Sequence, residues 1–266
     1  MLTAVRVPAR PVAAGRILLA LAALLTTLES AILLDHLQSG RVITPTGGPW
    51  SAAAVPAGAW SSVMSAAALL LLLGVASSAS AAVLAAGNIV LLGADQQLYS
   101  NHVFLLTLLC AAFAVSGCDR ALSLRSRLRP AGDRTIAAVV PWWPQLLAMS
   151  TLSACYLFAG LSKANPEFLS GDLIASMSAS WVPAQLAAWA TVPTEVAIGV
   201  GIWFRATRRW ALLLGVMLHA SIIVLLDSPL PFAAFALLCF SVYPLVWSWP
   251  DLDQAEATAI QRSSVA

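Results

Sequence analysis

The stretch ILLALAALLTTLESAILL, residues 17–34, is apolar apart from two threonines, one glutamate and one serine. At about 1.5 Å of rise per residue, a helix of this length nearly spans a bilayer core of about 30 Å. Arg6, Arg10 and Arg16 precede the stretch as they would in a signal peptide, but no clear small-residue cleavage site follows it. We therefore expect an uncleaved first membrane helix.

The apolar character extends over the whole chain. Of its 266 residues, 60% are hydrophobic and 10% are charged, and the mean hydropathy is +0.85; a soluble domain carries about 25% charged residues. Eight apolar segments can be marked, at 16–34, 60–76, 79–94, 101–117, 143–163, 187–204, 209–226 and 230–248. We predict an all-α, polytopic membrane helical bundle with about eight transmembrane helices. A seven-helix arrangement, with the second and third segments joined, stays open.

The basic residues favour eight helices. Of the 14 lysines and arginines, all except Arg41 and Lys163 fall on one side of the membrane if eight helices start from the inside. The positive-inside rule predicts this pattern, and seven helices would split the arginine clusters. We expect a multi-pass protein of a bacterial plasma membrane with both termini cytoplasmic. It would comprise a cytoplasmic segment at 1–15, a transmembrane domain at 16–248 and a disordered cytoplasmic tail at 249–266.

Several kinds of site are not indicated by the sequence. The net charge is only +2, and no Walker or dinucleotide-binding glycine motif occurs, so we expect no nucleic-acid partner. The three histidines are far apart and the four cysteines form no CxxC pair. We therefore expect no metal site, and we interpret Cys110, Cys155 and Cys239, which lie inside apolar runs, as small apolar residues. The sequence leaves a buried disulfide open. The one partner that the composition requires is the lipid bilayer.

Lys163 is the only lysine of the chain, and it lies at the end of the fifth apolar segment. Asn165–Pro166 should end the helix there, because the residue before a proline avoids the α-helical region. Unlike an arginine, a buried lysine can lose its proton and act as a general base. The alternatives are an ammonium that reaches the headgroups from the helix end, or one neutralised by Glu167.

Four more ionisable residues lie inside apolar segments: Glu29, His102, Glu195 and His219. Such residues are costly in a bilayer, so each is a candidate for function. Each also has a structural interpretation: a packing or pairing role for Glu29, a hydrogen bond at a helix start for His102, a helix N-terminal carboxylate for Glu195 and a satisfied core histidine for His219.

Tyr156, Gly160 and Lys163 share one face of the fifth helix because they follow i, i+4 and i+7 spacing. The glycine leaves room for a ligand or for another helix beside the lysine. We predict that this face forms a wall of a polar pocket at the outer membrane face. The segment 164–186, which is not strongly polar, is expected to form an interfacial or re-entrant helix that caps the pocket.

Two stretches carry a resemblance to a known family. They are LYSNHVFLLTLLCAAFAVSGCDRALSL, residues 98–124, and YLFAGLSKANPEFLSGDLI, residues 156–174. Together they resemble the transmembrane domain of vitamin K-dependent γ-glutamyl carboxylase and its bacterial relatives, the HTTM (horizontally transferred transmembrane domain) family. The resemblance covers roughly residues 15–248. In size and layout the chain is similar to small members such as the membrane component that matures a sporulation-delaying peptide toxin.

The resemblance implies roles for particular residues. Lys163 matches the carboxylase lysine held to deprotonate vitamin K hydroquinone, so a reduced quinone is the implied cofactor, although the residues themselves identify none. Asn101 and His102 match an Asn-His pair that lies near the same site. On this interpretation Lys163 and His102 are catalytic. The substrate-binding residues would be Asn101, Tyr156, Glu195 and His219.

Two departures limit what the resemblance implies. The printed chain has no counterpart of the large lumenal domain with which the carboxylase grips its substrate, and Arg125 stands where many relatives carry an acidic residue. Carboxylation of a protein is therefore not implied. We expect an enzyme or maturation factor acting at the outer face on a quinone-like lipid, or on an exported peptide with a co-encoded maturation protein. The alternative is a non-catalytic assembly factor or small transporter module.

Overall fold

The structure of the chain is a computed structural model that describes residues 5–40, 52–128, 139–227 and 229–250. Within these ranges the long helices are α1 (Ala9–Ser39), α2 (Ala57–Leu73), α3 (Ser77–Ala94), α4 (Asn101–Ala114), α7 (Trp143–Lys163), α10 (Ala184–Gly201), α11 (Arg208–Leu225) and α12 (Pro229–Trp247). The short elements are the helices α5 (Leu124–Arg127), α8 (Pro166–Leu169) and α9 (Asp172–Ser176), the 3₁₀ turns η2 (Ala52–Ala54) and η3 (Gln96–Leu98), and the strands β1 (Arg6–Pro8) and β2 (Val139–Pro141). The predicted all-α helical bundle is confirmed.

Each of the eight predicted apolar segments corresponds to one long helix. The second and third segments are separate helices, α2 and α3, so the arrangement that joins them is wrong. The first helix extends beyond the predicted segment 16–34 at both ends, so Arg16 lies within the helix and not at its start. Arg16 is fully buried, and its guanidinium donates to the carbonyl oxygens of Leu71 at 2.9 Å and Leu122 at 2.6 Å. The two hydrogen bonds make a buried guanidinium acceptable, although its hydropathy alone argues against a place inside a membrane helix.

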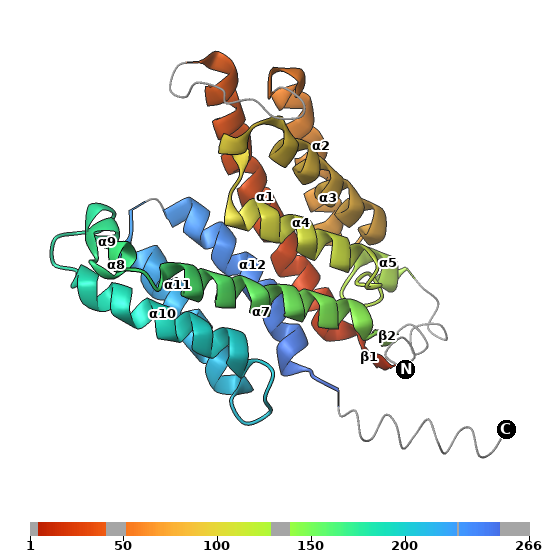
Figure 1. Cartoon of the computed structure of the whole chain (residues 1–266). Coiled ribbons are helices and arrows are strands. Elements are labelled where there is room, and N and C mark those ends of the chain that lie inside the picture. Colours follow the sequence, from red (N-terminus) through yellow and green to blue (C-terminus); the bar gives the residue numbers. More distant parts are fainter. Residues whose placement is uncertain (1–4, 41–51, 129–138, 228, 251–266) are drawn as a thin grey trace.

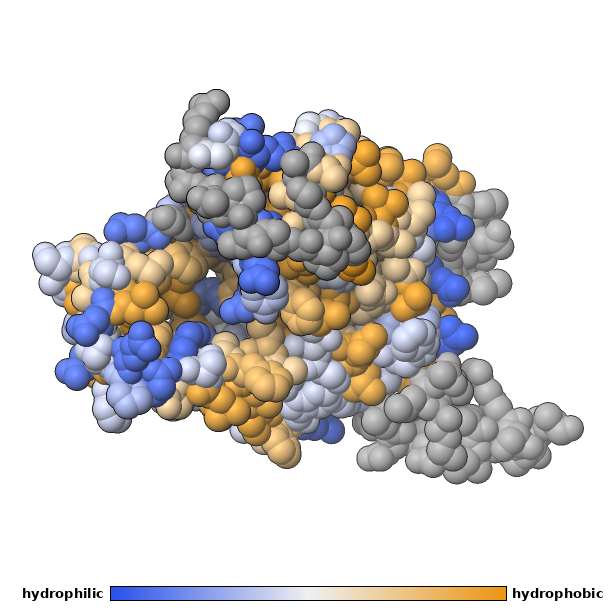
Figure 2. Space-filling view, turned by 45° about the horizontal axis from the view of Figure 1, so that its top comes forward, coloured by the Kyte–Doolittle hydropathy of each residue, from blue (hydrophilic) through white to orange (hydrophobic). Residues whose placement is uncertain are grey.

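The length and composition of the helices suggest a multi-pass membrane protein. Five helices, α1, α3, α7, α11 and α12, are long and apolar enough to cross a membrane, and α2 and α4 are shorter apolar helices. Figure 2 shows hydrophobic residues across the middle of one face, with hydrophilic residues gathered towards the left and right margins. Exposed side chains such as Phe158 and Val224, 75% and 78% accessible, suit contact with lipid. The orientation of the termini stays a prediction.

The helices form two groups that meet along α1 and α12 (Figure 1). In the first group α1 packs against α2, and α3 packs against α2 and α4; in the second, α10 packs against α7 and α11, and α11 against α12. The groups also meet where α4 contacts α7. The antiparallel pair β1–β2, with Arg6 opposite Pro141, joins the start of α1 to the start of α7; the sequence did not indicate these strands.

One predicted segment differs in detail from the structure, and most of another lies outside the described residues. The segment 164–186 contains no single capping helix but the short helices α8 and α9, which pack against α10. Of the tail predicted at 249–266, residues 251–266 lie outside the described residues. Trp249 is described, and its ring lies 5.4 Å from that of Trp142 and 5.8 Å from that of Trp203, between centroids.

Candidate functional site

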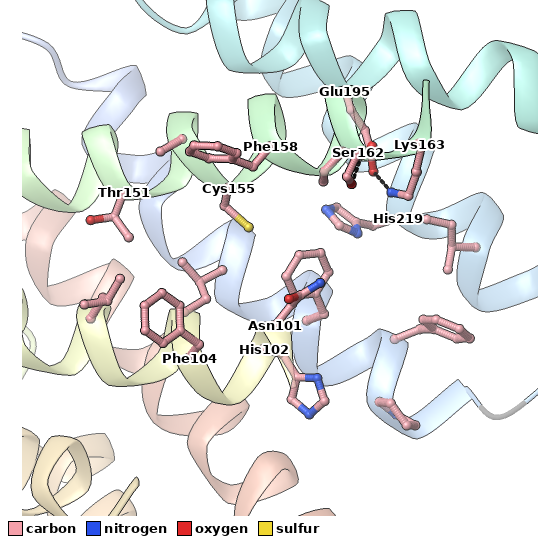
Figure 3. Close-up of a pocket in the computed structure, with 18 of the residues that line it drawn as sticks. Asn101, His102, Phe104, Thr151, Cys155, Phe158, Ser162, Lys163, Glu195 and His219 are labelled. Carbon is pink, nitrogen blue, oxygen red and sulfur yellow. Dashed lines mark hydrogen bonds and ion pairs between the residues drawn. The ribbon is translucent and has the colours of Figure 1, made fainter. Parts of the chain in front are cut away.

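A cavity of about 940 Å³ lies between α4 and α7 and extends to α11 and α12. Cavities of about 300–1,000 Å³ commonly hold small organic ligands. The wall is mainly aliphatic and aromatic, and the polar side chains that interrupt it include Asn101, His102, Lys163, Glu195 and His219. Figure 3 shows the α4 residues on one side of the cavity and the α7 residues on the other. The structure thus brings five of the six predicted site residues to one cavity.

The cavity wall continues onto the outer surface of the bundle. Phe104 and Leu108 of α4 and Phe158 of α7 line the cavity. These side chains are nevertheless 46%, 39% and 75% exposed on the molecule. Because α4 and α7 are apolar helices, this opening lies at a surface suited to hydrocarbon rather than water. An apolar ligand could enter from the bilayer without crossing an aqueous face.

Lys163 and Glu195 form an ion pair at the cavity wall. The lysine is the last residue of α7, Glu195 lies in the second half of α10, and Nζ is 2.5 Å from Oε1 (Figure 3). The Glu195 side chain is 6% exposed and that of Lys163 is 31% exposed. The second carboxylate oxygen, Oε2, is buried and has no hydrogen-bond partner among the described residues. Lys163 is therefore paired with Glu195, not with Glu167, and one acceptor position of the pair is open.

Gly160 allows α10 to approach α7 beside this pair. A Cβ atom on Gly160 would lie 3.0 Å from Val196 Cγ2, 3.2 Å from the Val192 carbonyl oxygen and 3.3 Å from Glu195 Cβ. The sequence allowed either a ligand or another helix beside Gly160, and the structure places helix α10 there. Any larger residue would have to push α10, and with it Glu195, away from α7.

The turn after α7 fixes the direction of the lysine. Asn165 caps α8 by accepting a hydrogen bond from the Phe168 amide at 2.9 Å, and its own amide donates to the Ser162 carbonyl at 2.7 Å. The helix ends at Lys163, as Asn165–Pro166 predicted. Gly171 follows with φ of 85°, and a Cβ there would lie 2.6 Å from the Gln185 backbone nitrogen. The stretch 156–174, which carries the family resemblance, therefore contains a tight turn, and this turn packs closely against the start of α10.

His102 and Asn101 reach the cavity from the first turn of α4. Ser100 caps this helix by accepting from the Val103 amide at 3.3 Å. His102 Nε2 lies 2.8 Å from Glu29 Oε2 of α1. This contact identifies the partner of Glu29, for which the sequence left pairing and function open. A carboxylate at Nε2 fixes the orientation of the ring and favours a proton on that nitrogen.

His219 belongs to a buried aromatic network behind the cavity. Its Nε2 lies 2.8 Å from the Tyr156 hydroxyl, which lies 3.0 Å from the Tyr243 hydroxyl. His219 lines the cavity, whereas Tyr156, predicted to bind substrate, lies behind His219 and is not part of the lining. Tyr156 can therefore position the imidazole but does not reach the space in front of it.

Sequence reasoning missed two members of this arrangement. Tyr243 carried no signal, because a tyrosine near the end of an apolar segment is ordinary in a membrane protein. Cys155, which lines the cavity, lies one residue before Tyr156 and was interpreted only as a small apolar residue. Among the described residues there is no group of three or more His, Cys, Asp or Glu side chains that could hold a metal ion.

Comparison with known proteins identifies the family but no individual relative. The family model described as HTTM domain matches residues 58–247, which is more than half of the chain. Among curated proteins and solved structures, none matches the chain. The matched range includes both sequence motifs and every cavity residue named above, whereas Glu29, which contacts His102 from α1, lies outside it. The chain is a member of the HTTM domain family.

Proposed function

We propose that the cavity binds a reduced, quinone-like lipid and that Lys163 and Glu195 together remove a proton from its hydroxyl group. The observation that carries the proposal is the Lys163–Glu195 pair at the wall of a largely apolar cavity, with Glu195 Oε2 unpartnered. The exposed apolar residues at the opening between α4 and α7 favour a membrane-soluble substrate over an exported peptide.

The pair can take up a proton without leaving an isolated charge. As the substrate hydroxyl gives its proton to Lys163 Nζ, Nζ passes one of its own protons to Glu195 Oε1, 2.5 Å away. Afterwards Glu195 is neutral, Lys163 is still an ammonium, and the substrate oxyanion lies beside that ammonium. The site therefore holds one paired cation and anion both before and after the transfer, which avoids the cost of an unpaired charge in an apolar environment.

The remaining polar groups would position the substrate. Asn101 and His102 lie on α4 and can bind a second oxygen of a ring held between α4 and α7, with Glu29 holding the imidazole. His219, backed by Tyr156, would form the inner end of the site. If the site acts at the outer face, as the arginine distribution predicts, the product is an anion available to an exported partner.

A direct test uses a short-chain naphthohydroquinone, kept reduced without oxygen, with the purified protein in nanodiscs. Wild type should produce the absorbance of the hydroquinone anion at a pH where the free compound is neutral. Lys163→Arg keeps the positive charge but cannot pass a proton on, so it should bind the compound and give no anion. Lys163→Ala should also give none, with partial recovery on addition of small amines. Glu167→Gln is the matched control and should behave as wild type.

The non-catalytic alternative, a binding or transport module, makes the opposite prediction. It needs only a cation at this position, so Lys163→Arg should retain function and Lys163→Ala should lose it. An anion signal of wild-type size from Lys163→Arg would rule out the proton-relay mechanism and favour that alternative.

A further inference from the structure

A second cavity, of about 930 Å³, lies at one end of the bundle, where α10 ends and α11 begins. It is bordered by the turn between α10 and α11 and by the end of α12, which Figure 1 shows at the same end of the molecule. Three arginines, Arg205, Arg208 and Arg209, line it together with four tryptophans: Trp203, Trp210, Trp247 and Trp249. The proposed catalytic site uses none of these residues.

The arginines are held in place by aromatic rings. The Arg208 guanidinium carbon lies 4.5 Å from the centre of the Trp249 ring, and that of Arg209 lies 5.1 Å from the centre of the Trp247 ring. Arg208 Nε also donates to the Ile202 carbonyl oxygen at 3.4 Å. Cation–π contacts of this kind orient a guanidinium while leaving its N–H groups free to bind an anion.

Among the residues that the structure describes, no carboxylate balances the positive charge of this cavity. No acidic residue is among those that line it, and in the described parts of the chain none of the three arginines forms an ion pair. Arg205 and Arg208 are close enough to repel each other. By contrast, Arg125 in the other arginine-rich segment contacts Asp119. Uncompensated guanidinium groups in a concave site favour a bound anion, and phosphate fits their geometry.

The surroundings point to a lipid as the carrier of that phosphate. Trp210 and Trp247 are 67% and 63% exposed, and tryptophans gather at the headgroup level of membranes. The arginine distribution predicts that this end faces the cytoplasm, where anionic phospholipids attract basic residues. We propose that the cavity lined by Arg205, Arg208 and Arg209 binds the phosphate group of an anionic phospholipid.

The test measures lipid binding to the purified, delipidated full chain in a neutral detergent by native mass spectrometry. Dioleoylphosphatidylglycerol is compared with dioleoylphosphatidylcholine, which has the same acyl chains and no net charge. Wild type should bind the anionic lipid at least tenfold more tightly. Arg205→Gln and Arg209→Gln should each weaken that binding about fivefold, the effect of about 1 kcal/mol for each basic residue near an anionic surface.

Two further variants separate a built site from general charge attraction. Arg10→Gln removes the same charge from an exposed position of α1 at the same predicted membrane face, and it should leave binding unchanged. Arg209→Lys restores the charge and should recover part of the affinity. Monodisperse elution from a sizing column identifies variants that remain folded. Equal losses in Arg10→Gln and Arg209→Gln would overturn the proposal.

A final arm distinguishes the source of the phosphate. The thermal unfolding midpoint of wild type is recorded with millimolar inorganic phosphate and, separately, with the anionic and the zwitterionic phospholipid. A rise with the lipid alone assigns the site to the headgroup, and equal rises assign it to soluble phosphate. No rise with either, or equal rises with both phospholipids, would refute an anion site.

Discussion

The Lys163–Glu195 pair permits a quantitative prediction, because its two members are buried to different extents. The Glu195 side chain is 6% exposed and that of Lys163 is 31% exposed, and both face the same cavity. Replacing Lys163 by methionine leaves a carboxylate that no described residue neutralises. Replacing Glu195 by glutamine leaves an ammonium that can turn towards the cavity opening. The two single variants should therefore differ in stability although they break the same ion pair.

The expected magnitudes follow from the cost of the group that is left behind. Removing one partner of a buried ion pair typically costs about 3–5 kcal/mol, and Lys163→Met should fall in this range. In Glu195→Gln the amide oxygen still accepts from Nζ, and the cost is that of a buried amide group without a partner, about 1–3 kcal/mol. The double variant leaves no charge behind. Its loss should be smaller than the sum of the single losses by about 1–3 kcal/mol.

Free energies of unfolding can be measured by reversible titration with a denaturing detergent, followed by tryptophan fluorescence, for wild type and all three variants. Glu167→Gln serves as the control for loss of a nearby carboxylate that does not contact Lys163, and it should change the stability by less than about 0.5 kcal/mol. The reasoning fails if Lys163→Met is no more destabilising than Glu195→Gln, or if the two losses simply add.

Three further predictions concern the scaffold, and the first two can be checked with the same unfolding titration. Arg16→Gln should lower the free energy of unfolding by at least about 1–3 kcal/mol, because the buried Leu71 carbonyl loses its donor and the part-buried Leu122 carbonyl loses a second hydrogen bond; exposed Arg10→Gln, in the same helix, should have little effect. Gly171→Ala should cost at least about 1–3 kcal/mol because its φ is 85° and a Cβ would meet the backbone of α10, whereas Gly58→Ala, where a Cβ meets nothing within 4 Å, should not destabilise. Gly160→Ala should lower hydroquinone deprotonation more than hydroquinone binding, since it displaces Glu195 from Lys163; equal effects on both would contradict this role.

The positions of the helices were predictable because the signal is local. An apolar run of sufficient length favours a helix that satisfies its own backbone in a membrane, wherever the rest of the chain lies. Residues 143–163 were predicted and found as α7 with the same bounds, since a tryptophan pair and Asn165–Pro166 mark its two ends. The first helix was misjudged at its start because the hydropathy of Arg16 does not reveal the carbonyls of Leu71 and Leu122 that satisfy it.

The candidate site was predictable only in part. Ionisable residues inside apolar segments are few, so their cost in a bilayer selected Glu29, His102, Lys163, Glu195 and His219. The structure brings the last four to one cavity, whereas Glu29 contacts His102 outside the cavity lining. Their roles in catalysis or binding remain predictions. The sequence did not indicate that Tyr156 lies behind His219, because helix periodicity gives the face of a residue but not what packs against that face.

The sequence by itself determined that this protein is a bundle of apolar helices with a few costly polar groups. Only the tertiary structure decided how those groups are paired. Lys163 meets Glu195 across 32 positions of sequence, Tyr156 meets His219 across 63, and Glu29 meets His102 across 73. Helix formation depends on neighbours three and four residues away, whereas these pairs depend on which helices pack together and at what depth. That choice is made by the whole bundle, where close approaches such as that of α10 to Gly160 set the distances between partners.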